Sequence, residues 1–144
     1  MDTTEVRRRF EATRVARLAT VDAAGQPHIV PITFALLGTH TIVTAVDHKP
    51  KRTTALRRLD NIAANPAVAV LVDHYANDWS ELWWARADGT ARMVPPGAEP
   101  GLHREALDAL ADRYPQYRET RPAGAVIVIE VGRWSGWAAT VSGR

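Results

Sequence analysis

A basic turn holds the residues whose types and spacing point most directly to chemistry. It reads Asp47-His48-Lys49-Pro50-Lys51-Arg52-Thr53-Thr54, and Arg57 and Arg58 follow it. Pro50 would stop a preceding strand, and either threonine can cap a helix that begins here. A helix N-terminus carries a partial positive charge, so cations beside it cost stability unless an anion neutralises them. The cations, free backbone N–H groups and hydroxyls together indicate a phosphate or carboxylate site; the alternative is a solvated basic face.

The segments around this turn predict a strand, a helix and a second strand. Residues 41–46 are β-branched and apolar, which favours a strand. Asn65-Pro66 would end the helix, and its apolar stripe consists of Leu56, Leu59, Ile62 and Ala63. Residues 67–72 are apolar throughout, which is typical of a strand inside a sheet that is covered on both faces.

The rest of the chain alternates strands with two further helices. We expect helices over residues 3–14 and 102–114. We expect strands over 15–22 and 27–37, joined by a turn at Gly25, and a strand over 82–94 with a bulge at Gly89. The last strand is expected over 125–131, and residues 133–137 follow it outside the strand. Antiparallel strands in succession, followed by a helix and more strands, predict a mainly β protein with flanking helices, folded as a barrel or curled sheet.

Residues 27–37 alternate between two faces of a strand. The face that we expect to lie in the core consists of His28, Val30, Ile32, Phe34 and Leu36. Pro31 lies in mid-strand on the other face and has no N–H to donate. It therefore marks a sheet edge, a bulge, or a place where a ligand replaces the neighbouring strand.

Composition limits the class of protein. The 144 residues suit a single domain, which we place over residues 1–144. The chain has no cysteine, and its five histidines lack metal-ligand spacing, so we predict no metal site. No apolar run reaches the roughly 18 residues that span a bilayer, and residues 1–5 lack the order of a signal peptide, so we expect a cytoplasmic protein without membrane contact. A formal net charge of +2 is weak support for nucleic-acid binding, which we do not expect.

Three common catalytic motifs are absent from the sequence. It contains no Gly-x-Ser-x-Gly elbow, no Gly-Lys-Ser/Thr loop and no Gly-x-Gly-x-x-Gly fingerprint. Among five tryptophans, Trp79 stands apart because turn-forming residues surround it in Asn77-Asp78-Trp79-Ser80. We expect Trp79 to contact a cofactor or a second subunit, although a loop can also fold a tryptophan back into its own core.

Several short motifs combine into a familiar pattern. They are Leu18-Ala19-Thr20-Val21-Asp22 before Gly25-Gln26-Pro27-His28, the strand over 42–46, the basic segment 49–59, Asn65-Pro66, Val70-Leu71-Val72-Asp73 and Trp79. This pattern resembles the pyridoxamine 5'-phosphate oxidase-like superfamily. Within it, the sequence is most similar to the branch that uses the deazaflavin coenzyme F420.

The resemblance implies a split β-barrel of the FMN-binding type. It also implies a homodimer with the cofactor in a groove between subunits. By position, Lys51 and Arg52 would hold the cofactor phosphate, with Lys49 and Thr53 nearby. Because these cations are adjacent, the resemblance assigns the main phosphate contact only to within one residue. The backbone of Thr44-Ala45-Val46 and of the stretch from Pro31 to Thr33 would face the ring, and Trp79 would close over it.

The implied activity is hydride transfer from reduced F420 to a small conjugated substrate. The cofactor carries this chemistry, so we assign no catalytic residue. Two alternatives remain open: an FMN-dependent oxidase or reductase with the same fold, and a non-catalytic cofactor- or haem-binding protein. Nucleic-acid binding through residues 7–9 and 49–58 ranks last, since the basic segment lacks interleaved aromatic residues.

Overall fold

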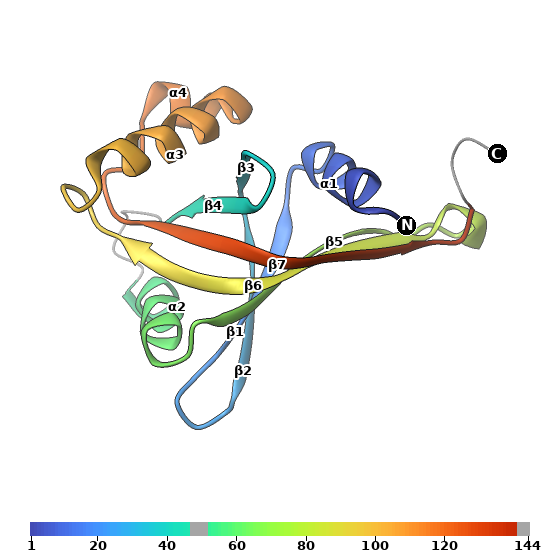
Figure 1. The fold of residues 1–144 in the computed structure, drawn as a ribbon, viewed down its shortest axis with the longest axis horizontal. Helices are drawn as coiled ribbons and strands as arrows, with labels where there is room; N and C mark the ends of the chain where they lie inside the picture. The colour runs from blue at the N-terminus through green and yellow to red at the C-terminus, as the bar shows by residue number, and fades with distance from the viewer. Residues whose placement is uncertain (47–51, 141–144) are drawn as a thin grey trace.

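A computed structural model describes residues 1–46 and 52–140 of the chain, with the backbone alone for residues 52–56. The helices are α1 (Thr3–Glu11), α2 (Arg52–Ala64), α3 (Pro100–Arg113), α4 (Pro115–Glu119) and the 3-10 helix η1 (Trp79–Glu81). The strands are β1 (Ala16–Val21), β2 (Pro27–Ile32), β3 (Ala35–Leu37), β4 (Thr41–Ala45), β5 (Ala67–His74), β6 (Trp83–Val94) and β7 (Val126–Ala138). Mainly β structure with flanking helices was predicted, and this prediction is confirmed (Figure 1).

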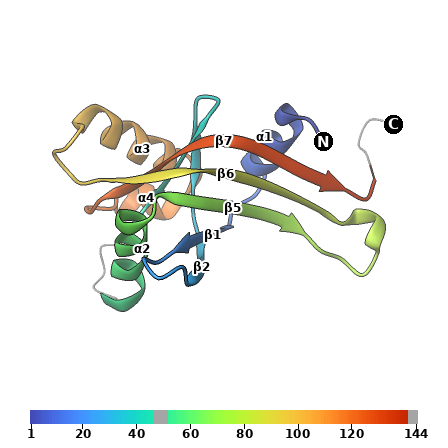
Figure 2. The same ribbon diagram turned by 60° about the horizontal axis from the view of Figure 1, so that its bottom comes forward.

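The strands form one antiparallel sheet that bends back on itself. Their order is β2-β1-β5-β6-β7-β4-β3, which places β2 and β3 at opposite ends of the sheet. Only Thr33 and Phe34 separate these two strands in the sequence, and so short a connection covers at most about 11 Å. The two ends of the sheet must therefore lie close together, which gives the curled shape of a split barrel (Figures 1 and 2).

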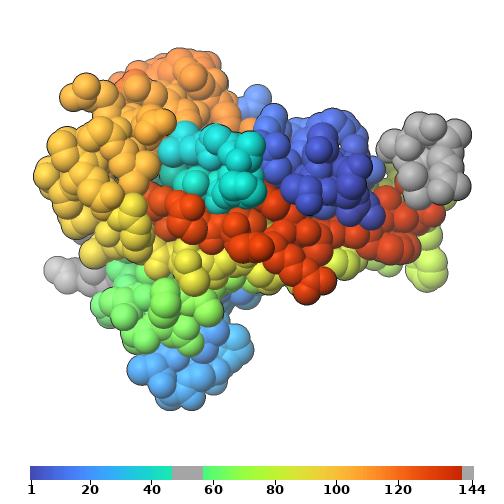
Figure 3. All heavy atoms as spheres, viewed as in Figure 1, coloured from blue at the N-terminus to red at the C-terminus, as the bar shows by residue number. Residues whose placement is uncertain are grey.

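Helices close the core of this barrel. Phe10 of α1 packs edge-on against Phe34 and against Trp134 of β7, with ring centroids 5.8 and 5.4 Å apart. A second apolar cluster joins Leu110 of α3 to Val43 and Val128 of the sheet. Figure 3 shows β3 and β4 in cyan filling the space between α1 in blue and the α3–α4 pair in orange. None of the helices in the described residues is long and apolar enough to cross a membrane.

The bulge at Gly89 is confirmed. The register of β6 against β7 shifts between Asp88 and Gly89. A side chain on Gly89 would collide with the carbonyl oxygen of Glu130, which explains why glycine occupies this position.

Four sequence predictions need correction. The strand expected over residues 27–37 is two strands, because the chain crosses from one end of the sheet to the other at Thr33 and Phe34. Ala35, expected opposite the core face, is buried in the cluster under α3. The last strand continues to Ala138 because it pairs with β6 as far as Trp83. Residues 67–72 were expected to be covered on both faces, but in β5 only Val68, Val70 and Val72 are buried.

The hydroxyl of Tyr114 secures the crossing at Phe34. It accepts a hydrogen bond from the backbone N–H of Phe34 at 3.2 Å and lies 3.1 Å from the carbonyl oxygen of the same residue. It also lies 2.8 Å from the carbonyl oxygen of Arg14, so its single proton serves one of two acceptors. Backbone groups that lose their strand partners at the crossing are thus satisfied by one side chain.

Replacing Tyr114 with phenylalanine tests this role. We expect Tyr114→Phe to lower the free energy of unfolding by about 1–3 kcal/mol, because the Phe34 N–H is left buried without a partner. Chemical denaturation measures the change, and Tyr75→Phe is the matched control because Tyr75 is exposed. Equal midpoints for the two variants would contradict the assignment.

Candidate functional site

A cavity of about 550 Å³ opens between the crossing at Thr33, the end of β4, and helices α2 and α4. The residues that line it come from four separate parts of the chain: Pro31, Ile32, Thr33, Thr44, Ala45, Arg58, Gln116, Tyr117, Thr120 and Pro122. The pocket therefore lies at the split in the barrel, where β2 ends and β3 begins and where Tyr117 of α4 contacts Thr33.

Thr33 organises the wall of this cavity. Its carbonyl oxygen accepts a hydrogen bond from the buried hydroxyl of Thr44 at 2.7 Å. Its own hydroxyl lies 2.8 Å from the hydroxyl of Tyr117, so one of the two donates to the other. These bonds join β4 and α4 through one residue of the crossing, which holds the cavity wall in a single arrangement.

A buried polar pair sets the position of α2. The side-chain amide of Asn61 donates to the hydroxyl of Thr20 on β1 at 3.0 Å, and both residues are buried. Ile62 enters the barrel core next to them, as its helical spacing predicted. Because α2 is attached at Asn61, the side chain one turn earlier, Arg58, is directed into the cavity.

Arg58 is a cation whose surroundings do not fully satisfy it. Its Nε is buried and has no hydrogen-bond partner within the described part of the chain. Burial lowers the pKa of the guanidinium, and the nearby Tyr117 offsets part of that effect. Arginine nevertheless remains charged in proteins, so a partly buried and unpaired guanidinium favours an acceptor oxygen from a ligand.

The structure brings together four of the predicted ring-facing residues. Pro31, Thr33, Thr44 and Ala45 all line the cavity. Val46 does not line it, since its side chain belongs to the barrel core and its N–H donates to Ala125 O at 3.1 Å.

The predicted phosphate-binding residues are only partly described. Arg52 opens α2 and Thr53 follows it, but neither side chain is described, and Lys49 and Lys51 lie outside the described residues. Their role stays a prediction.

Trp79 lies outside the core of its own chain. It is 67% exposed and begins η1, which connects β5 to β6 at the far end of that hairpin from α2 (Figure 2). Contact with a cofactor or a second subunit stays a prediction, and within one chain Trp79 does not line the cavity.

Sequence reasoning missed the contribution of α4. Gln116 and Tyr117 belong to this five-residue helix, and Thr120 and Pro122 follow it. A helix this short has no apolar periodicity to reveal which face it presents. Arg58 was noticed among the basic residues but was not assigned to the site, because only the structure shows that Asn61, one turn later, is buried.

Comparison with known proteins identifies the family. The model of the pyridoxamine 5'-phosphate oxidase family matches residues 2–138. The chain belongs to this family. The superfamily resemblance noted in the sequence is therefore confirmed. No protein of curated function matches the sequence.

Solved structures share the fold of this family member. A conserved hypothetical protein from Mycobacterium tuberculosis is 21% identical with a TM-score of 0.72, over 96% of this chain and 86% of that one. A FAD-binding protein from Mesorhizobium loti is 22% identical with a TM-score of 0.70, over 94% of both chains. The haem storage protein HutZ from Vibrio cholerae is 17% identical with a TM-score of 0.70, over 94% and 92%. The fold is thus common to proteins with different ligands.

Removing the charge of Arg58 tests whether it lacks a partner. We expect Arg58→Met to leave the free energy of unfolding of the ligand-free protein unchanged or higher, because an unpaired, partly buried charge carries a desolvation cost. Denaturant titration measures this, with Arg57→Met as the exposed control from the neighbouring position. A decrease of more than about 1 kcal/mol would mean that Arg58 is paired within the protein.

Proposed function

We propose that this member of the pyridoxamine 5'-phosphate oxidase family binds the deazaflavin coenzyme F420 in the cavity and catalyses hydride transfer to a small conjugated substrate. The observation that carries the proposal is the guanidinium of Arg58, which lines a cavity of about 550 Å³ and whose Nε has no hydrogen-bond partner among the described residues. A flat ring with carbonyl oxygens supplies an acceptor for this guanidinium, and the cavity volume falls in the range of small-molecule sites.

The lining residues fit such a cofactor. Thr33, Thr44 and Ala45 form the wall that a ring would contact, and Arg58 would donate to one of its oxygens. The phosphate would lie toward the start of α2, where Arg52 and Thr53 stand in the sequence. When bound, the deazaflavin supplies the hydride chemistry, and the chain's own residues bind and orient the ring and favour negative charge beside Arg58.

FMN is the second candidate cofactor. It presents a phosphate to the same cations, and the Mesorhizobium loti protein of the same fold is described as FAD-binding. The sequence resemblance to the F420 branch is what favours the deazaflavin. Haem fits less well, because haem iron commonly takes a histidine, cysteine, methionine or tyrosine ligand, and only Tyr117 among the described lining residues is of these types.

A second copy of the chain would complete this site. The outer face of the sheet is not covered by any described helix at Ala69 and Leu71 of β5, and Ile29 and Trp137 on the same face are 63% and 49% exposed. Pro31, which lines the cavity, pairs with Arg17 of β1, and Arg17 pairs with Leu71. The cavity thus borders an apolar face that a monomer would leave in water.

Cofactor titration tests the proposed site. We expect Arg58→Met to weaken F420 binding about tenfold or more, and Lys51→Ala or Arg52→Ala to weaken it by roughly 1–3 kcal/mol, the scale of a charge-assisted hydrogen bond. Fluorescence titration of the ligand-free protein with F420 and with FMN measures both affinities. Arg104→Met, on the exposed side of α3 and outside the cavity lining, is the control, and tighter binding of FMN than of F420 would select the second candidate.

Sedimentation tests the predicted homodimer. At micromolar concentration we expect about twice the 15.8 kDa mass of one chain. Leu71→Lys should shift the protein toward the monomer, since a charge at the centre of the outer face opposes self-association. Glu105→Lys on the exposed side of α3 is the charge control. A single-chain mass for the wild type would rule the dimer out.

A further inference from the structure

A second cavity lies on the other side of Tyr117. Its volume is about 600 Å³, and its lining consists of Arg14, Val15, Thr33, Tyr114, Pro115, Gln116 and Tyr117. Thr33, Gln116 and Tyr117 also line the cavity of about 550 Å³ described above. The two cavities therefore share a wall, and the hydrogen bond between Thr33 and Tyr117 lies in it.

The walls of the second cavity suit a flat conjugated molecule. The rings of Tyr114 and Tyr117 are nearly perpendicular, with an interplanar angle of 73° and centroids 5.7 Å apart. Pro115 and Gln116 separate them along the chain, and Val15 is 45% exposed at the end of the loop that follows α1. Aromatic rings and small apolar groups in this arrangement accept a planar apolar body by stacking and edge contacts.

One charged group adds a requirement to that apolar lining. The guanidinium of Arg14 lies over the ring of Tyr114, 5.9 Å from its centroid, and its Nη1 donates to the carbonyl oxygen of Arg113. Within the described part of the chain, no carboxylate forms an ion pair with it. Its remaining N–H groups are available for a ligand, and a guanidinium prefers a carboxylate because the two groups match in charge and geometry.

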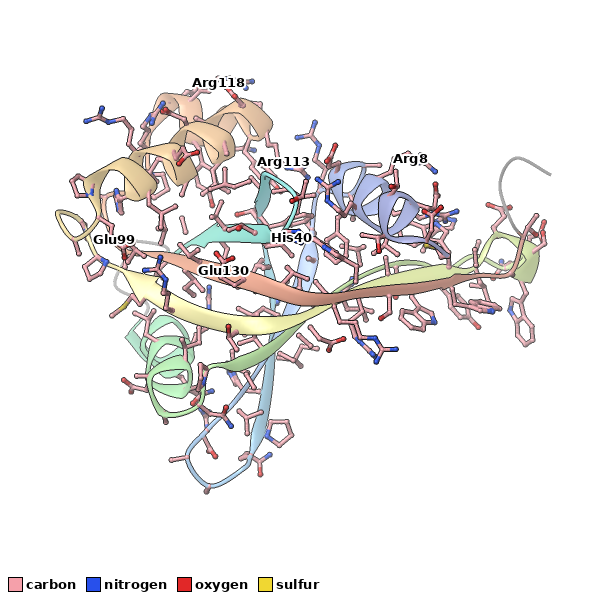
Figure 4. All side chains as sticks on the ribbon, in the orientation of Figure 1. Arg8, His40, Glu99, Arg113, Arg118 and Glu130 are labelled. Atoms are coloured by element: carbon pink, nitrogen blue, oxygen red, sulfur yellow. The ribbon has the colours of Figure 1, made fainter. Side chains whose placement is uncertain are left out.

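The neighbours of Arg14 hold it in place. Arg113, which Figure 4 shows between α3 and α1, donates to the carbonyl oxygens of Glu11 at 2.9 Å and Thr13 at 2.5 Å. The carbonyl oxygen of Arg14 lies 2.8 Å from the Tyr114 hydroxyl. The end of α1 is thus attached to the end of α3 by several hydrogen bonds, and Arg14 is fixed at the edge of the cavity.

We propose that this second cavity is a separate ligand site, and that its ligand is a flat conjugated molecule with a carboxylate that Arg14 holds. The wall of Thr33 and Tyr117 separates this ligand from one in the first cavity, so the two cavities are occupied independently.

The test uses two probes that match in shape and differ in charge. trans-Cinnamate is flat, conjugated and anionic, and its amide, cinnamamide, is flat, conjugated and neutral. Binding to the cofactor-free, full-length protein is measured by titration in two-dimensional amide NMR. We expect cinnamate to shift the amide signals of residues 14, 15 and 116, and to bind about tenfold more tightly than cinnamamide.

Two variants separate charge recognition from cavity shape. Arg14→Gln should weaken cinnamate binding about tenfold and leave cinnamamide binding unchanged, whereas Arg17→Gln, a change of the same type on the outer face of β1, should alter neither. Val15→Trp should abolish binding of both probes by filling the cavity. In both Arg14→Gln and Val15→Trp, F420 affinity should stay at the wild-type value.

The outcomes distinguish this inference from the proposed function. No binding of cinnamate by the wild type, signal shifts confined to residues 44, 45 and 58, or equal cinnamate affinities for wild type and Arg14→Gln would each overturn it. Failure of F420 to bind the wild type would instead overturn the proposed function, because the cinnamate titration requires no cofactor.

Discussion

The two-residue connection at Thr33 and Phe34 is the constraint on which the rest of the structure depends. It joins strands at opposite ends of the sheet order, so a sheet with this connection cannot remain flat. The curl encloses the apolar core, in which Phe10 packs edge-on against Trp134. It also leaves backbone groups without strand partners at one place, where the Tyr114 hydroxyl accepts a hydrogen bond from the N–H of Phe34. The same two-residue connection therefore closes the barrel and opens the cavity beside it.

The charge of Arg58 is placed where it opposes folding and favours binding. Within the described part of the chain the Nε of Arg58 has no partner, so this guanidinium carries a desolvation cost. The hydrogen bond between Asn61 and Thr20 holds α2, and with it Arg58, in this position. Such an arrangement is typical of a site that is organised before its ligand arrives. The interaction energy is then available to the ligand, since little rearrangement is needed when it binds.

The two faces of the sheet are covered unequally. Helix α1 packs in the barrel core against one face, and α3 packs against the opposite face of β3, β4 and β7. The outer face at β5 and its neighbours carries partly exposed apolar residues between the ion pairs Arg17–Asp73 and Arg86–Asp88. Exposed pairs of this kind contribute little to stability and keep the face soluble in a single chain. A face that mixes apolar area with paired charges is suited to association with a matching surface. The proposed cofactor cavity lies at its border.

The sequence alone determined the elements and several of the site residues. Alternation in β2, the glycine at the bulge of β6 and the apolar stripe that buries Ile62 are local signals, because they follow from the periodicity of strands and helices. Local reading also singled out Pro31, whereas Thr33, Thr44 and Ala45 followed from the resemblance to the family. Only the tertiary structure decided that one predicted strand breaks at Thr33, that Tyr117 reaches this residue from α4, and that Arg58 faces them both. The physical reason is that these contacts join segments far apart in the chain, and no periodicity within a short helix such as α4 records which partner it meets.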